Sequence, residues 1–418
     1  MKRMLSGIIN NGVLSILFTG TILISLFSCC NNPVEDAKKR NILFYIGADN
    51  NGLDNGNEGD EPRQKINQIC AGWQPGKGEM LIYTDQTNKG AYLLRVNETK
   101  GADGLYGLDT VMVFGKENSA GSGVLSRVIN QVVQTYPADS YGMIFFSHAS
   151  GWMPYDMLSK PRSLVIDKGE ETKYEMEYYD FAAAIPDKQF DFIIFEACLI
   201  ADVMSMYELR NKAEYILASS AEIVVPGFVR TNTYKNEIMR LYDTRSDLKY
   251  IVTSFAKSYY DGIASIPENS IFCSTTLSVL KMDEMANLAS VTKTLLKGKI
   301  IDETNLLVDS IQHFDRPYTG TFGWQHNSRY FDFAHTMEKL VSASDYKAFN
   351  DQMEKTVVWK ASTKRFLLGD YQNGLPDYDD YDGFFIVRHS GLTTYIKQDV
   401  YPELNLAYKN SSWHKAIY

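Results

Sequence analysis

Short, nearly continuous apolar runs recur along the chain and constrain its fold more than any other feature. Three of them cover residues 41–48, 141–146 and 190–195. Runs of this length and composition are typical of strands buried on both faces of a sheet. A helix pattern over 124–133, ended by Pro137, alternates with them. Strands that alternate with helices predict an α/β fold with parallel βαβ units and helices on both faces.

Weaker patterns complete this prediction. Residues 79–84 and 215–219 are further strand candidates, whereas the runs over 92–96 and 110–114 are shorter and are expected at the periphery. No internal repeat interrupts the series. The sheet is therefore expected to be large and mostly parallel, with smaller strands at its edge.

The last third of the chain has a different pattern. It is mostly helical, as at 285–296 and 331–341, and strand character returns at 383–387. We therefore predict an α/β domain over residues 41–275 and a helix-rich region over 276–418 that packs on it.

The N-terminal segment indicates export. Lys2 and Arg3 are followed by an uncharged stretch over residues 4–28, which is the pattern of a signal peptide. Leu26, three places before Cys29 and with a small residue between them, resembles the bacterial lipobox. That resemblance implies cleavage before Cys29 and a diacylglycerol on its thiol. A single uncleaved membrane helix is the alternative, because about twenty apolar residues can cross a bilayer.

In both cases the folded body faces away from the cytoplasm. Residues 1–28 are predicted to be the lipoprotein signal peptide, and the polar residues 29–40 are predicted to be a tether. The expected location is the bacterial cell envelope, on the periplasmic or the outer-membrane face, with the membrane as a partner through the lipid anchor.

Charge and cysteine content limit the classes of binding partner and of metal site that this chain is expected to have. The 418 residues carry a formal net charge of −9, and no long Lys/Arg block is present, so nucleic acid is not expected as a partner. Five cysteines include no CxxC pair and no zinc spacing. Cys70 and Cys273 could pair in an oxidising compartment. We favour the alternative that both are small buried apolar residues.

Two of the apolar runs end near residues suited to nucleophilic catalysis. His148 comes two residues after the run over 141–146, and Cys198 comes three residues after the run over 190–195. In parallel α/β sheets, reactive groups gather at the carboxyl ends of the strands. If the two strands are neighbours, His148 and Cys198 face each other at one edge of the sheet.

This pairing suits acyl transfer. A thiol is a strong nucleophile only as the thiolate, and a nearby imidazole can take its proton and then protonate the leaving amine. The spacing of 50 residues leaves room for a crossover helix and matches the known spacing of His before an Ala-Cys core in caspases. Taken singly, His148 and Cys198 have the alternative interpretation of ordinary loop and packing residues.

The same two blocks resemble a known family. Residues 147–152 (SHASGW) are similar to S-H-G-S-G-W of the clostripain family of cysteine peptidases, and residues 195–201 (FEACLIA) are similar to its D-A-C-L-M. Residues 49–51 and 219–222 give weaker matches, so that the resemblance covers roughly residues 41–230. It implies a caspase-like fold and a cysteine endopeptidase that acts on proteins or peptides. No cofactor is expected to be required, and Ca²⁺ is possible because some family members use it.

The resemblance also implies roles for single residues. His148 would be the general base and acid, and Cys198 would form the acyl-enzyme. The backbone N–H groups of Ala149 and Cys198 would form the oxyanion hole, in which each donor typically contributes about 3 kcal/mol. Glu196 and Glu222 would line the first substrate pocket, where carboxylates favour Arg or Lys at the cleavage position.

Family members are often activated by a cut between the His and Cys blocks. Basic residues in that insertion are candidates for such a cleavage: Lys160, Arg162, Lys168 and Lys173. An uncut surface loop is the alternative.

Two further interpretations stay open. The acidic cluster over 377–383 departs from the EF-hand spacing at Tyr381, and it is either a weak Ca²⁺ site or a solvated turn, which we favour. No other metal site is predicted. The second functional hypothesis is a catalytically inactive binding lipoprotein that kept the caspase fold, because Ala149 stands where the family has Gly.

Overall fold

A computed structural model gives the fold of this chain. The residues that it describes are 38–48, 61–86, 89–102, 104–154, 166–167, 174–224, 226–315, 327–368 and 383–418. The predicted signal peptide, Cys29 and nearly all of the predicted tether lie outside these residues. Among the helices in the described part of the chain, none combines the length and the apolar character needed to cross a membrane.

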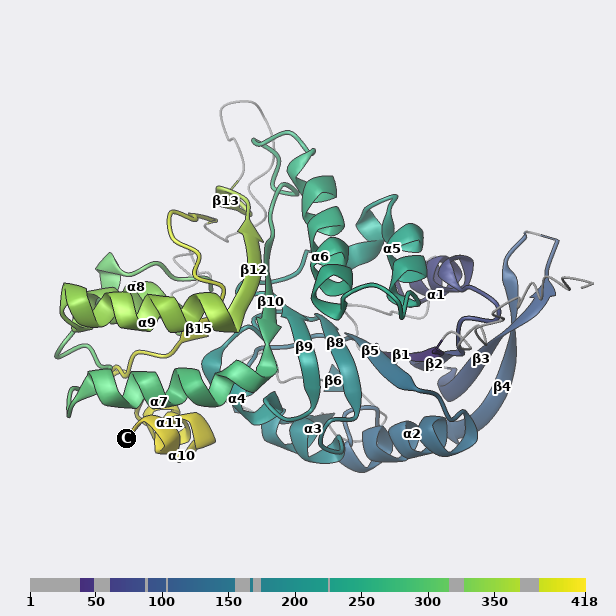
Figure 1. Cartoon of the computed structure of the whole chain (residues 1–418), viewed down its shortest axis with the longest axis horizontal. Coiled ribbons are helices and arrows are strands. Elements are labelled where there is room, and N and C mark those ends of the chain that lie inside the picture. Colours follow the sequence, from purple (N-terminus) through teal and green to yellow (C-terminus); the bar gives the residue numbers. More distant parts are fainter. Residues whose placement is uncertain are drawn as a thin grey trace, which may run out of the picture. The chain divides into compact units, whose positions relative to one another are not determined.

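The centre of the fold is a nine-stranded sheet (Figure 1). In spatial order, its strands are β12 (Val357–Ser362), β10 (Thr276–Lys281), β9 (Ala213–Ala218), β8 (Phe190–Glu196), β5 (Ser140–Phe146), β1 (Arg40–Gly47), β2 (Met80–Gln86), β3 (Gly90–Lys100) and β4 (Tyr106–Gly115). The five strands from β9 to β2 are parallel to one another. Antiparallel strands add to both sides, β3 and β4 beyond β2, and β10 and β12 beyond β9.

Side-chain alternation in the parallel strands produces two separate cores. In β1, Leu43 and Tyr45 belong to one core, whereas Ile42, Phe44 and Ile46 belong to the other. All eight residues of β1 are buried. A strand between two apolar layers has no face for polar side chains, and this explains the continuous apolar runs in the sequence.

Helices cover both faces of the sheet (Figure 1). One face carries α1 (Glu61–Gly72), α5 (Tyr234–Leu241) and α6 (Leu248–Ala264), which pack into one core. The other core takes side chains from α2 (Ser122–Thr135), α3 (Tyr178–Ala184), α4 (Val203–Leu209), α7 (Met285–Leu296), α8 (Phe333–Leu340), α9 (Ala343–Thr356), α10 (Pro402–Asn410) and α11 (Ser412–Ile417). The predicted α/β class, mostly parallel and covered on both faces, is confirmed.

Short elements complete the described part of the chain. They are the 3₁₀ turns η1 (Gly227–Arg230), η2 (Met282–Glu284) and η3 (Val308–Ser310), and the two-residue strands β6 (Ile166–Asp167), β7 (Tyr174–Glu175), β11 (Phe331–Asp332), β13 (Arg365–Phe366), β14 (Phe384–Phe385) and β15 (Thr393–Thr394). Of the late strand expected over residues 383–387, only the two residues of β14 are in a strand.

The C-terminal region is helical as expected, but it also contributes to the sheet. β10 and β12 both lie after residue 275, and they extend the sheet of the preceding segment in antiparallel order. One sheet thus runs across the boundary predicted at 275/276. The described residues after position 37 cluster as a single compact unit.

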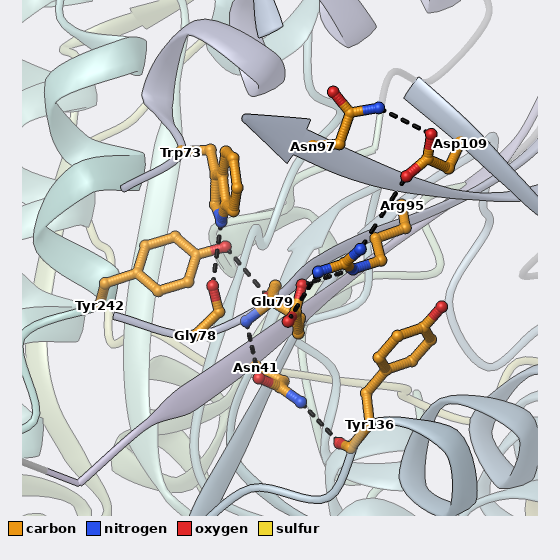
Figure 2. Close-up of polar contacts among 9 residues, drawn as sticks. All are labelled: Asn41, Trp73, Gly78, Glu79, Arg95, Asn97, Asp109, Tyr136 and Tyr242. Atoms are coloured by element: carbon orange, nitrogen blue, oxygen red, sulfur yellow. Dashed lines mark hydrogen bonds and ion pairs between the residues drawn. The ribbon is translucent and has the colours of Figure 1, made fainter. Parts of the chain in front are cut away.

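A polar network closes the amino ends of the parallel strands (Figure 2). The Glu79 carboxylate accepts hydrogen bonds from Arg95 Nε at 2.7 Å and from Arg95 Nη2 at 3.1 Å. The Glu79 backbone N–H donates to Asn41 Oδ1 at 2.7 Å, and Asn41 Nδ2 donates to the Tyr136 carbonyl at 2.6 Å. The Tyr242 hydroxyl donates to the Glu79 carbonyl at 3.3 Å. This edge therefore holds β1, β2, β3 and the segment before β5 together.

Candidate active site

The carboxyl ends of β5 and β8 bring the two predicted reactive residues to one edge of the sheet. The strands are parallel neighbours, and Phe146 at the end of β5 is in register with Glu196 at the end of β8. His148 and Cys198 each follow this pair by two residues. The prediction that the two strands are neighbours is confirmed, and the equal offsets bring the backbones of His148 and Cys198 out of the sheet at corresponding positions.

The loop that carries His148 is anchored on both sides. The Ser147 hydroxyl donates to the Gly47 carbonyl at 2.7 Å, which ties the end of β5 to the end of β1. The Tyr330 hydroxyl donates to the Ser150 carbonyl. Ser147 and Ser150 are buried, whereas His148 is half-buried. Fixed neighbours on both sides restrict the position of the imidazole.

The loops that follow β5 and β8 lie in direct contact. Gly151 has a φ of +59°, and a Cβ at this position would lie 2.4 Å from the Leu199 carbonyl oxygen and 2.9 Å from Asp202 Oδ2. Only glycine fits such a close approach at a positive φ. The His148 loop therefore packs against the residues that immediately follow Cys198.

Cys198 is partly exposed, and its sulfur has a backbone donor. The Ile223 N–H points at Cys198 Sγ with a nitrogen–sulfur distance of 3.3 Å. The neighbouring Leu199 has a φ of +60°, and its N–H donates to the Ala221 carbonyl at 3.0 Å. The thiol in turn lies 4.0 Å from the Ile223 carbonyl, so both backbone polar groups of Ile223 contact the sulfur. The segment Ala221–Ile223 thus fixes the Cys198 loop.

Ala149 is buried, and it is not among the described non-glycine residues with positive φ. The alanine that replaces the family's glycine therefore sits in a backbone conformation open to any L-residue. Its role in an oxyanion hole, together with the Cys198 N–H, stays a prediction.

Glu196 is buried and paired within the protein. Its side chain is 0% exposed and forms an ion pair with Lys65, whose side chain is 1% exposed, with an Nζ–Oε1 distance of 2.5 Å. The Phe228 N–H donates to the same oxygen. Burial raises the pKa of Glu196, and the Lys65 ammonium is the largest influence that lowers it. Lys65 therefore pairs with one oxygen of the carboxylate that the resemblance assigns to a basic substrate side chain, and that assignment stays a prediction.

Glu222 is half-buried and adjoins Ile223, whose N–H contacts Cys198. It is therefore the one predicted pocket carboxylate that keeps solvent exposure close to the thiol. The four cleavage candidates between the two blocks lie outside the described residues: Lys160, Arg162, Lys168 and Lys173.

The remaining sequence predictions concern thiols and metals. Cys70 and Cys273 are both free and buried, so the interpretation as packing residues is confirmed and the disulfide is not formed. Burial raises the pKa of the Cys70 thiol to about 12. Within the described ranges, no group of three or more His, Cys, Asp or Glu residues could hold a metal ion. The acidic cluster over 377–383 lies outside the described residues except for its last glycine.

The sequence analysis did not identify Lys65. It lies on α1 next to Ile66 and four residues before Ile69, in a stripe that continues at Cys70, and all four are buried. A lysine in the apolar stripe of an amphipathic helix is the sequence pattern that could have identified it, because a buried charge needs a polar or charged partner.

Asp202 is a second buried carboxylate near the site that the sequence analysis missed. Its Oδ1 accepts from the Ser205 N–H at 2.8 Å and caps α4. Its Oδ2, which faces Gly151, is buried and has no hydrogen-bond partner among the described residues. Burial raises the pKa of Asp202 to about 7. The order Asp-x-x-Ser at the start of a helix is the sequence signal for this cap.

Comparison with protein families decides the classification. The sequence matches the model of the clostripain family over residues 45–384. This chain belongs to the clostripain family. It is accordingly a cysteine peptidase, and the resemblance inferred from the His and Cys blocks is confirmed.

Solved structures of clostripain-family proteins share the fold. The inactive zymogen of a C11 protease from Parabacteroides distasonis is 27% identical, with a TM-score of 0.73 over 91% of this chain and 99% of that chain. A secreted C11 cysteine protease from Bacteroides thetaiotaomicron, in complex with an irreversible peptide inhibitor, is 24% identical, with the same TM-score of 0.73 and the same coverage of 91% and 99%. A comparison with curated proteins gave no match.

Proposed function

We propose that this clostripain-family peptidase is an endopeptidase that uses Cys198 as nucleophile and His148 as its acid–base partner. The observation that carries the proposal is the register of β5 and β8, which offsets both residues by two positions from the Phe146–Glu196 pair. The contact between Gly151 and Leu199 keeps the two loops together beyond the strand ends.

The reaction divides into two steps. The imidazole of His148 takes the thiol proton, Cys198 Sγ bonds to the scissile carbonyl carbon, and the amine leaves with the proton from His148 as the C–N bond breaks. Water then hydrolyses the thioester with His148 as the base. The N–H groups of Ala149 and Cys198 are the proposed donors to the oxyanion.

The decisive experiment compares Cys198→Ala and His148→Ala with the wild type on peptide substrates and with a thiol-reactive peptide probe. Both variants are expected to lose at least about a thousandfold in kcat/KM. Wild-type Cys198 is expected to label rapidly, and His148→Ala is expected to label slowly. Cys273→Ala is the matched control, since it removes a buried free thiol and should change neither readout.

A binding protein without activity is the rival function. Its motivation is Ala149, which replaces the family's glycine. A folded wild-type protein that neither cleaves peptides nor labels at Cys198 at neutral pH would establish the rival and remove the peptidase mechanism.

Of the two carboxylates that the family resemblance assigns to the first substrate pocket, Glu196 is paired internally. For the location, we propose attachment to the cell envelope through lipid on Cys29, on the sequence pattern that precedes it. Cys29→Ser should then release the protein from the membrane fraction and abolish labelling with a fatty-acid probe. Retention of the label in Cys29→Ser would disprove the anchor.

A further inference from the structure

A buried ion pair lies at the strand end that precedes the proposed nucleophile. Glu196, the last residue of β8, precedes Cys198 by two positions. Two residues of chain span at most about 7 Å, so the Glu196 and Cys198 backbones are close neighbours. In the acyl-enzyme the residue whose carbonyl is attacked is bonded to Cys198 Sγ. We expect the side chain of that substrate residue, called P1, to lie near the Glu196 end of β8.

The carboxylate in this region is enclosed by the protein itself. The Lys65 ammonium lies 2.5 Å from Glu196 Oε1 and 4.1 Å from the centre of the Phe146 ring, so it is held by an ion pair and a cation–π contact. The Phe228 N–H donates to the same oxygen. A Cβ on Gly227, which has a φ of +76°, would lie 2.3 Å from Oε1. Residues of α1 and of η1 thus close around Glu196.

The packing of Lys65 keeps its ammonium beside Glu196. The ammonium also lies 5.4 Å from the centre of the Tyr234 ring, and the Lys65 side chain is 1% exposed. An exposed lysine could move aside for a substrate cation. A buried lysine held by two aromatic rings and a carboxylate has no solvated position within reach.

The formal charge of the Lys65–Glu196 pair is zero. A P1 arginine or lysine would bring a second cation towards the Lys65 ammonium and would find the nearest carboxylate already neutralised. An uncharged P1 side chain meets no such repulsion. We infer that Lys65 determines specificity: it withholds Glu196 from the substrate, and the enzyme cleaves after uncharged residues in preference to Arg or Lys. This inference rests on the proposed peptidase function and goes beyond it.

The experiment uses peptides that differ only at P1, in pairs that match in shape: arginine with citrulline, and lysine with norleucine. The wild type is expected to show at least a tenfold higher kcat/KM for the uncharged member of each pair. Lys65→Met keeps an unbranched apolar stem and removes the charge. It should leave the negative charge of Glu196 uncompensated near the P1 side chain and raise the arginine-to-citrulline ratio by tenfold or more.

Two controls identify the cause. In Lys65→Met/Glu196→Gln the gain for arginine should disappear, since no carboxylate remains to attract it. Lys77→Met, which removes an exposed lysine elsewhere, should leave the ratio of the wild type unchanged.

A tenfold wild-type preference for arginine over citrulline would overturn the inference and would point to Glu222. An unchanged ratio in folded Lys65→Met would also overturn it. If Lys65→Met does not fold, the inference is still tested by the ratios of kcat/KM in the wild type. Lys65→Arg, which keeps the ion pair, is then the second protein in which these ratios are measured. Failure of the proposed function looks different: no peptide is cleaved and Cys198 is not labelled, and the inference on specificity then falls as well.

Discussion

The two ends of the parallel sheet each hold a glutamate paired with a basic residue, and the pairs differ in almost every physical respect. At the amino ends, Glu79 and Arg95 are 29% and 33% exposed, and Arg95 makes two hydrogen bonds to the carboxylate (Figure 2). At the carboxyl ends, Glu196 and Lys65 are 0% and 1% exposed, and a single nitrogen–oxygen contact joins them.

The difference indicates what each pair can do. Water screens the Glu79–Arg95 pair, so it orients β3 beside β2 at little gain in stability. The Glu196–Lys65 pair is buried, so water does not screen its charges. A costly pair of this kind beside a proposed nucleophile is better explained by its effect on the site than by a contribution to folding.

The largest expected effect comes from breaking the enclosed pair. Lys65→Met should lower the free energy of unfolding by about 3–5 kcal/mol, because it leaves the Glu196 carboxylate buried without a counter-charge. Lys65→Met/Glu196→Gln should recover most of this loss. Urea denaturation at neutral pH measures both. Equal losses in the single and the double variant would show that packing of the lysine stem, and not the charge, stabilises this end.

A second effect tests the other buried carboxylate at the same end. Burial raises the pKa of Asp202 to about 7 from its ordinary value of 3.8. Between these values the folded state binds the proton more tightly than the unfolded state, so stability falls as pH rises through this window. Asp202→Asn keeps the cap and removes the titration. It should be more stable than the wild type at pH above 7 by up to about 4 kcal/mol.

Denaturation of both proteins over the range from mildly acidic to neutral pH gives the measurement. The difference in unfolding free energy should shrink towards zero on the acidic side. A difference that does not change with pH would mean that Asp202 does not titrate in this range.

The smallest effect is expected at the exposed pair. Glu79→Gln should change the free energy of unfolding by at most about 1 kcal/mol, and salt should reduce the difference further. Urea denaturation at low and high salt measures it. A loss as large as that of Lys65→Met would remove the contrast between the two ends of the sheet.

Much of this fold was predictable because its central strands have no polar face. β1, β5 and β8 each appear in the sequence as a continuous apolar run, and their boundaries differ from the predicted ones by about one residue. β12 has only one fully buried residue in six, so its pattern is too weak to be recognised as part of the sheet. Edge strands share this limitation, since only part of their surface is buried.

The site was predictable only where the pattern is local. His148 and Cys198 follow apolar strands directly, and their neighbours in sequence identify them. The pairing of Glu196 depends on Lys65, which lies on α1, 131 positions earlier in the sequence. No local pattern encodes which side chain a helix will place against a strand end.

The hydrogen bonds between β5 and β8 have a consequence for maturation. All four candidate processing sites fall between these two neighbouring strands. A nicked molecule would consist of two polypeptides that still share one ladder, one of them bearing the imidazole and the other the thiol. Such fragments would separate on a denaturing gel and migrate as a single particle under native conditions. Proteolysis at these sites could therefore switch the enzyme only by local rearrangement, never by shedding half of it.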